Sequence, residues 1–137
     1  MKMKKVLTLV SLCLLGLSSY GQGEDCPNAI PLAANGCSGP ASYDNTGITG
    51  TLTGGGSCFT GGSNNGMWFT FVAATPTVVI DVLGTGITDP EVVLMENASG
   101  CGGTFTELAC ESPGGDPTLT FSALIPGTTY YLSLIHI

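Results

Sequence analysis

The side chains of this sequence that could do chemistry are carboxylates and cysteines. The chain has ten Asp and Glu residues, six Cys, one His (His136) and three basic residues, which all lie within the first five positions. A Ser or Cys nucleophile needs a base beside it, and after residue 22 only His136 offers one. Carboxylate chemistry, as in a glycoside hydrolase, remains open, and it needs two acids flanking a sugar bond.

Seven acids in the second half of the chain are available for such a pair: Asp81, Asp89, Glu91, Glu96, Glu107, Glu111 and Asp116. Most of them lie in expected turns or at outward strand positions, where solvated surface acids are usual. We therefore predict no catalytic residue and no enzymatic activity in this chain. A carboxylate-based glycoside hydrolase is kept as a remote alternative.

Two acidic loops could bind calcium, which takes oxygen ligands from such loops. The candidate ligands are Asp89 and Glu91 in 88–91 and Asp116 in 112–116. The Asp-x-Asp-x-Asp-Gly spacing of an EF-hand loop is absent, and aspartates that form turns explain the same pattern. Calcium is thus the one cofactor that we consider, and we predict no other.

Five cysteines follow residue 22, and the cysteines of an exported protein usually form disulfides. Cys101 and Cys110 lie close in sequence and form the first predicted pair; Cys26 and Cys37 form the second. Cys58 is then left over, and we expect its partner in a missing C-terminal piece. A zinc site is disfavoured because there is no Cys-x-x-Cys pair and a single histidine.

The N-terminus predicts export. A basic stretch at 1–5 is followed by an apolar run at 6–17 and small residues at 18–22, the layout of a secretory signal peptide. The run is too short to span a bilayer, which needs roughly 20 residues. We expect residues 1–22 to be removed, no membrane insertion afterwards, and a protein that is secreted or displayed at the cell surface.

Cleavage would remove every basic residue. Losing three lysines changes the formal charge from −7 to −10. A surface without Lys or Arg cannot neutralise phosphates, so nucleic acid is excluded as a partner.

The last six residues, 132–137, resemble the translation of a transposon adapter used in sequencing libraries. We interpret them as an artefact, which gives His136 no functional weight. The natural chain would then continue beyond residue 131.

Residues 23–131 predict one all-β domain. Short apolar or alternating runs occur at 67–72, 77–83, 91–96, 105–110, 118–121 and 128–132, separated by Gly-rich or Pro-rich turns. Thr75-Pro76 is suited to closing a hairpin between the first two runs. We expect a jelly-roll-like β-sandwich of about 7–8 short antiparallel strands, with the last strand or strands missing.

Aromatic residues are concentrated in the run at 67–72, where Trp68 could stack on a sugar. Its place in the most apolar run favours the core instead. Tyr43 and Tyr131 are the alternative sugar contacts.

Four motifs in order carry a resemblance to a known family: Asp25-Cys26-Pro27-Asn28-Ala29-Ile30, Trp68-Phe69-Thr70-Phe71, Cys101-Gly102-Gly103 and Pro126-Gly127-Thr128-Thr129-Tyr130-Tyr131. The chain resembles the sandwich modules of secreted Bacteroidetes proteins and is similar to bacterial pre-peptidase C-terminal domains. The resemblance covers about 25 to 131.

Modules of that kind are appended to exported peptidases, glycosidases and adhesins, near type IX secretion signals or gliding-motility-associated domains. The resemblance implies further domains in the same chain and a non-catalytic accessory binding or adhesion module. An extracellular glycan or protein would be its ligand. A structural spacer or folding module beside a catalytic or sorting domain is the alternative.

Overall fold

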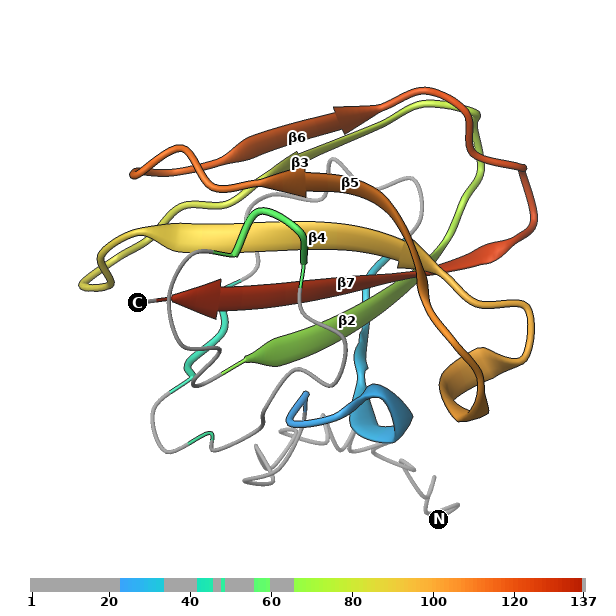
Figure 1. Cartoon of the computed structure of the whole chain (residues 1–137), viewed down its shortest axis with the longest axis horizontal. Coiled ribbons are helices and arrows are strands. Elements are labelled where there is room, and N and C mark those ends of the chain that lie inside the picture. Colours follow the sequence, from blue (N-terminus) through green and yellow to red (C-terminus); the bar gives the residue numbers. More distant parts are fainter. Residues whose placement is uncertain (1–22, 34–41, 46–47, 49–55, 60–65, 137) are drawn as a thin grey trace, which may run out of the picture.

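The computed structural model describes residues 23–33, 42–45, 48, 56–59 and 66–136 (Figure 1). The predicted signal peptide, Cys37 and Ile137 lie outside these residues. Within the described part there are two 3-10 helices, seven strands and no α-helix: η1 Cys26–Asn28, β1 Ile30–Pro31, β2 Met67–Val72, β3 Val78–Asp81, β4 Pro90–Glu96, η2 Gly100–Gly102, β5 Thr106–Glu111, β6 Thr118–Phe121 and β7 Thr129–His136.

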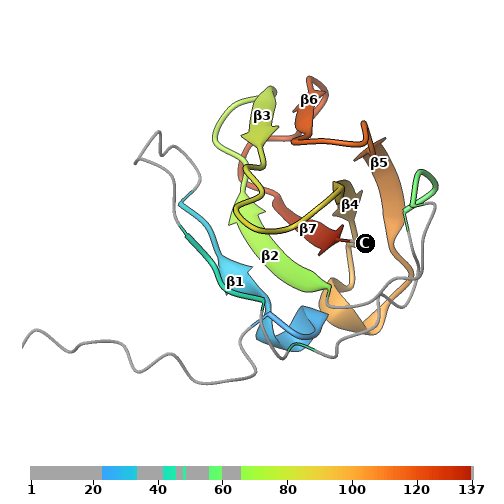
Figure 2. The ribbon, with the colours of Figure 1, turned by 90° about the vertical axis from the view of Figure 1, so that its left-hand side faces the viewer.

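The strands form a five-stranded sheet and a two-stranded sheet. The order in the larger sheet is β1-β2-β7-β4-β5, and β3 pairs with β6 in the smaller one (Figure 2). The all-β prediction is confirmed. The expectation of purely antiparallel pairing is wrong at one edge, because β1 runs parallel to β2. The larger sheet is therefore mixed.

Residues 73–77 do not close a hairpin between the strands on either side. β2 pairs with β1 and β7, whereas β3 pairs with β6 in the other sheet. The segment with Thr75 and Pro76 instead carries the chain from one sheet to the other. Such a crossing cannot be predicted from local sequence, because two strands joined by a short turn have the same local pattern whether or not they pair with each other.

The two sheets pack face to face over one apolar cluster. Leu119 of β6, with an exposed fraction of 0%, contributes from the smaller sheet, and Phe69, Phe71, Leu94 and Leu132 contribute from the larger one. In the smaller sheet Val78 and Ile80 face this cluster and Val79 and Asp81 face outward, as the alternation predicts.

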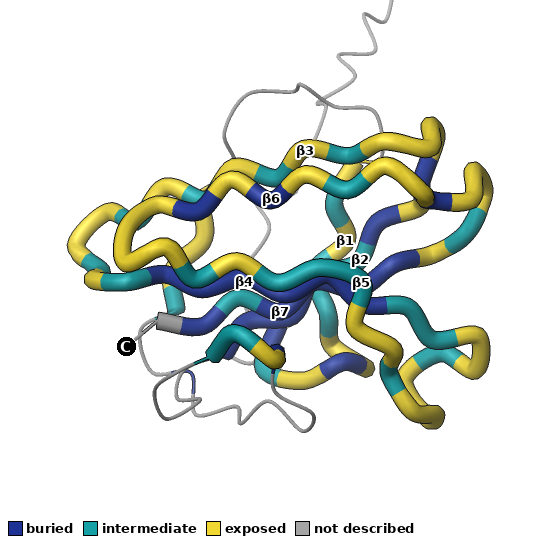
Figure 3. Tube along the Cα trace, turned by 45° about the horizontal axis from the view of Figure 1, so that its top comes forward, coloured by how far each residue is buried: buried dark blue, intermediate teal, exposed yellow. Residues whose placement is uncertain are grey.

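The far face of the larger sheet is also buried. Trp68, Val93, Met95 and Tyr131 form a second cluster there, against Cys26. As a result β4 is buried from Pro90 to Met95, which Figure 3 shows as a continuous dark stretch. A strand covered on both faces reads as an apolar run rather than an alternation, as at 91–96.

Tyr130 ties the start of β7 to the preceding turn. Its ring is buried and stacks on Phe71, and its hydroxyl accepts a hydrogen bond from the Ile125 amide at 2.9 Å. A tyrosine hydroxyl that bonds backbone a few residues upstream is the tyrosine corner of Greek-key domains. This contact fixes how the chain enters the central strand.

β7 extends four residues beyond the predicted run at 128–132. It pairs with β2 as far as Leu134 and with β4 as far as His136, and Ile135 is buried. Residues 132–136 are therefore part of the sheet. The structure does not test whether an adapter sequence encodes them, so that interpretation stays a prediction. No helix among the described residues is long and apolar enough to cross a membrane.

Candidate functional site

Two disulfides cross-link the chain, and neither is a predicted pair. Cys26 bonds Cys101, with Cα atoms 5.5 Å apart, and Cys58 bonds Cys110, with Cα atoms 5.8 Å apart. The predictions of Cys101–Cys110 and Cys26–Cys37, and of a missing partner for Cys58, are therefore wrong. Two disulfides are typical of proteins in oxidising compartments.

Strand geometry explains why the nearest cysteines in sequence do not pair. Cys101 lies in η2, and Cys110 is the fifth residue of β5. At about 3.3 Å per residue, the step from Thr106 to Cys110 alone spans roughly 13 Å. A disulfide allows about 4.4–6.8 Å between Cα atoms, so pairing these two cysteines would require residues 102–105 to turn back along the strand. Each of them instead bonds a cysteine that is distant in sequence.

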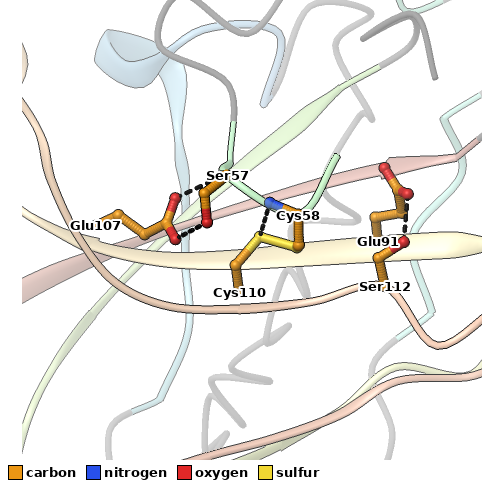
Figure 4. The surroundings of a disulfide bond; sticks show 6 residues. All are labelled: Ser57, Cys58, Glu91, Glu107, Cys110 and Ser112. Carbon is orange, nitrogen blue, oxygen red and sulfur yellow. Dashed lines mark hydrogen bonds between the residues drawn. A yellow bond between two sulfur atoms is a disulfide. The ribbon is translucent and has the colours of Figure 1, made fainter. Parts of the chain in front are cut away.

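The Cys58–Cys110 bond is the centre of the most elaborate side-chain site in the described structure (Figure 4). It joins residues 56–59, which we call the clamp loop, to β5. Beside it the carboxylate of Glu107 accepts two hydrogen bonds from Ser57, one from the amide at 2.7 Å and one from the hydroxyl at 2.5 Å. The Cys58 amide donates to the Cys110 Sγ at 3.3 Å.

Gly56 lets the clamp loop lie directly on the sheet. A Cβ atom at this buried position would lie 2.7 Å from the Cys110 Sγ, 3.1 Å from the Val93 Cβ and 3.2 Å from the Phe59 ring. The first of these separations is shorter than real Cβ contacts, and the other two are tighter than most of them. A side chain at position 56 would therefore force the loop or its neighbours, Cys110 and Val93, to shift.

Glu91 and Ser112 form a second polar pair close to the disulfide (Figure 4). The Ser112 hydroxyl donates to the Glu91 carboxylate at 2.5 Å. Glu91 lies in β4, not in a loop, and its exposed fraction is 0%. A buried carboxylate is tolerated only when it is hydrogen-bonded, and Ser112 supplies such a bond.

The described residues contain no group of three or more His, Cys, Asp or Glu side chains placed to hold a metal ion. Two of the three calcium candidates accept hydrogen bonds from separate partners. Asp116 accepts a hydrogen bond from the Gly84 amide at 2.9 Å, and Glu91 accepts from Ser112. Asp89 directly precedes β4, with a positive φ of 54°. The structure therefore does not bring Asp89, Glu91 and Asp116 together as one ligand set.

The three aromatic candidates for sugar stacking differ in their exposure to solvent. Trp68 is 3% exposed and packs against Phe105 with ring centroids 5.2 Å apart, which confirms its core placement. Tyr131 is also buried and meets Phe105 edge-on, so its assignment as an exposed contact is wrong. Tyr43 is 43% exposed and remains available on the surface.

Ser57 was not singled out from the sequence, and Glu107 was named only as one of seven available acids. The two residues are 50 positions apart, and no local pattern links them. Only the disulfide partner of Cys58 could have indicated which strand the 56–59 segment contacts. No family model, no curated protein and no solved structure matches the chain.

Proposed function

We propose that this chain is a non-catalytic binding or adhesion module, a jelly-roll-like β-sandwich within a larger secreted or cell-surface bacterial protein. The observation that carries the proposal is the clamp loop, held to the sheet by a disulfide and by the paired Ser57–Glu107 hydrogen bonds. A loop fixed before binding loses less conformational entropy on contact with a ligand. Binding residues are concentrated on loops that a rigid scaffold positions.

The carboxylates support a binding role over hydrolysis. Several of them accept hydrogen bonds that join distant parts of the chain or stabilise a local turn, rather than facing each other across an open site. They are Asp25 with Asn28, Asp81 with Thr118, Glu91 with Ser112, Glu107 with Ser57, and Asp116 with Gly84. Carboxylates used in this way stabilise the folded structure.

The charge of the chain limits the classes of ligand that it can bind. After residue 22 the chain has ten acids and no Lys or Arg. Phosphate-rich partners are repelled by such a surface. The proposed partner is an extracellular glycan or a protein surface, with further domains of the same chain beside the module.

The test is a binding screen of the exported chain against extracellular glycans and proteins, followed by titration of each positive. The Ser57→Ala and Glu107→Gln variants loosen the clamp loop without touching the core. We expect saturable binding that weakens in both variants.

A matched control lies in the smaller sheet, where the exposed Thr118 hydroxyl donates to Asp81 at 2.7 Å. Thr118→Ala removes the same kind of hydrogen bond in the other sheet, outside the clamp loop, and should leave affinity unchanged. Equal weakening in all three variants would place the ligand elsewhere. No saturable ligand in the screen would favour the spacer or folding module.

A further inference from the structure

The peptide bond between Asp89 and Pro90, at the start of β4, has an unusual backbone. Asp89 is the one non-glycine residue of the described structure with a positive φ, 54°. The ring of a following proline normally holds the preceding residue in the extended region, with φ near about −120°. Asp89 therefore departs from the preference of L residues and from that of residues before proline. Strained conformations of this kind cluster at functional positions.

One of the two carboxylate oxygens of Asp89 makes no hydrogen bond. Its Oδ1 atom is buried and has no partner among the described residues. The γ-carboxyl of an aspartate can close a five-membered ring onto the carbonyl carbon of the same residue. An oxygen without a competing hydrogen bond is available for that attack.

Proline at the next position makes the bond easier to break. Its nitrogen belongs to a tertiary amide, which accepts a proton more readily than the secondary amide nitrogen of other peptide bonds, and it leaves as a secondary amine. Pro90 is itself buried at the first position of β4 and makes no backbone N–H bond there.

We propose that the Asp89–Pro90 bond is a self-cleavage site that converts the module into a two-chain form. A carboxyl oxygen of Asp89 bonds to the Asp89 carbonyl carbon, the bond from that carbon to the Pro90 nitrogen breaks, and the carboxyl proton moves to that nitrogen. One water molecule then opens the resulting cyclic anhydride and leaves two carboxyl groups on Asp89. The net reaction consumes one water and involves no oxidation or reduction.

The chain contains its own control for this chemistry. Asp116–Pro117 is the same dipeptide, and Pro117 is as buried as Pro90. Asp116, however, does not have a positive φ, and its Oδ1 accepts the Gly84 amide hydrogen at 2.9 Å. The two bonds join the same residue types, but only Asp89 combines a positive φ with an Oδ1 atom that has no hydrogen-bond partner.

Cleavage would not separate the halves. Both disulfides span the bond, because Cys26 and Cys58 precede residue 89 and their partners Cys101 and Cys110 follow it. The pairing of β2 with β7 also joins the two pieces. The product is a folded module of two chains linked by two disulfides.

The experiment incubates the exported, disulfide-bonded chain in mildly acidic buffer and follows intact mass with and without reduction. We expect one species without reductant and two fragments, ending at Asp89 and beginning at Pro90, after reduction. Cleavage at 89–90 should exceed cleavage at 116–117 by about tenfold in the folded protein, which corresponds to about 1.4 kcal/mol of strain lost in the transition state. In denaturant the two bonds should break at similar rates.

Two variants separate self-cleavage from a contaminating protease. Asp89→Asn removes the carboxyl proton and should abolish the fragments, whereas Asp116→Asn should leave them unchanged. Similar rates at the two bonds in the folded protein would overturn the proposal, and this comparison needs no variant to fold. Undiminished cleavage in Asp89→Asn would overturn it as well.

Discussion

Replacing Cys58 and Cys110 together by alanine removes the covalent link between the clamp loop and β5. The two residues are 52 positions apart, and closing a loop of that size in the unfolded chain corresponds to about 4 kcal/mol of stability. The other bridge interleaves with this one and already shortens the path between residues 58 and 110. We therefore expect a loss of about 3.5 kcal/mol rather than the full value.

Such a loss is large against the total stability of a small domain, about 5–15 kcal/mol. Urea unfolding of the mature chain measures it, with Cys37→Ala as the common background so that no thiol is left to exchange. The m-value should rise, because an unfolded chain with one cross-link fewer exposes more surface.

Cys26→Ala with Cys101→Ala is the matched comparison, with a separation of 75 positions. By the same relation it should cost at least as much. A loss below about 1 kcal/mol together with an unchanged m-value for the Cys58 and Cys110 pair would refute the reasoning that this bridge restrains the unfolded chain.

Three further substitutions test the packing. Gly56→Ala should destabilise the domain by about 1–3 kcal/mol in thermal unfolding, because its Cβ would overlap the Cys110 sulfur, whereas Gly102→Ala, with nothing within 4 Å, should leave stability nearly unchanged. Equal midpoints for these two variants would contradict the close approach. Tyr130→Phe should cost about 1 kcal/mol in urea unfolding, since it removes the acceptor of the Ile125 amide; no loss would show that the tyrosine corner does not contribute. Leu119→Ala should cost about 2–5 kcal/mol by calorimetry, and a smaller value would mean that the two sheets close over the cavity.

Local patterns located the strands well because strand periodicity is a property of a few neighbouring residues. The alternation at 77–83 separates Val78 and Ile80, which face the core, from Val79 and Asp81, which face outward, and the apolar run at 91–96 corresponds to β4. Pairing was harder, since it depends on contacts between distant segments. Nothing near Ile30 indicates that it runs parallel to Phe69.

Most of the candidate site could not be predicted from the sequence, because its contacts also join segments that are distant along the chain. The acids were identified as residue types, but their partners, such as Ser57 for Glu107, lie about half the chain away. Glu91 was placed in a loop because Asp89 and Pro90 precede it, although it is the second residue of a doubly covered strand. Turn-forming residues mark where a strand begins without showing which face will be buried.

The Cys26–Cys101 disulfide also determines how this module would respond to a pulling force. Tension that enters near Cys26 passes through the sulfur atoms to Cys101 and bypasses β2, β3 and β4. Only the chain beyond Cys101 can then lengthen under load. Reducing that single bond would leave the Cys58–Cys110 bond in place, so the path from Cys26 to Cys110 would lengthen from 9 residue steps to 32. That adds 23 steps, about 80 Å at roughly 3.4 Å per residue. The oxidised chain would therefore lengthen less under load than the reduced chain, and its redox state would set how far it can extend.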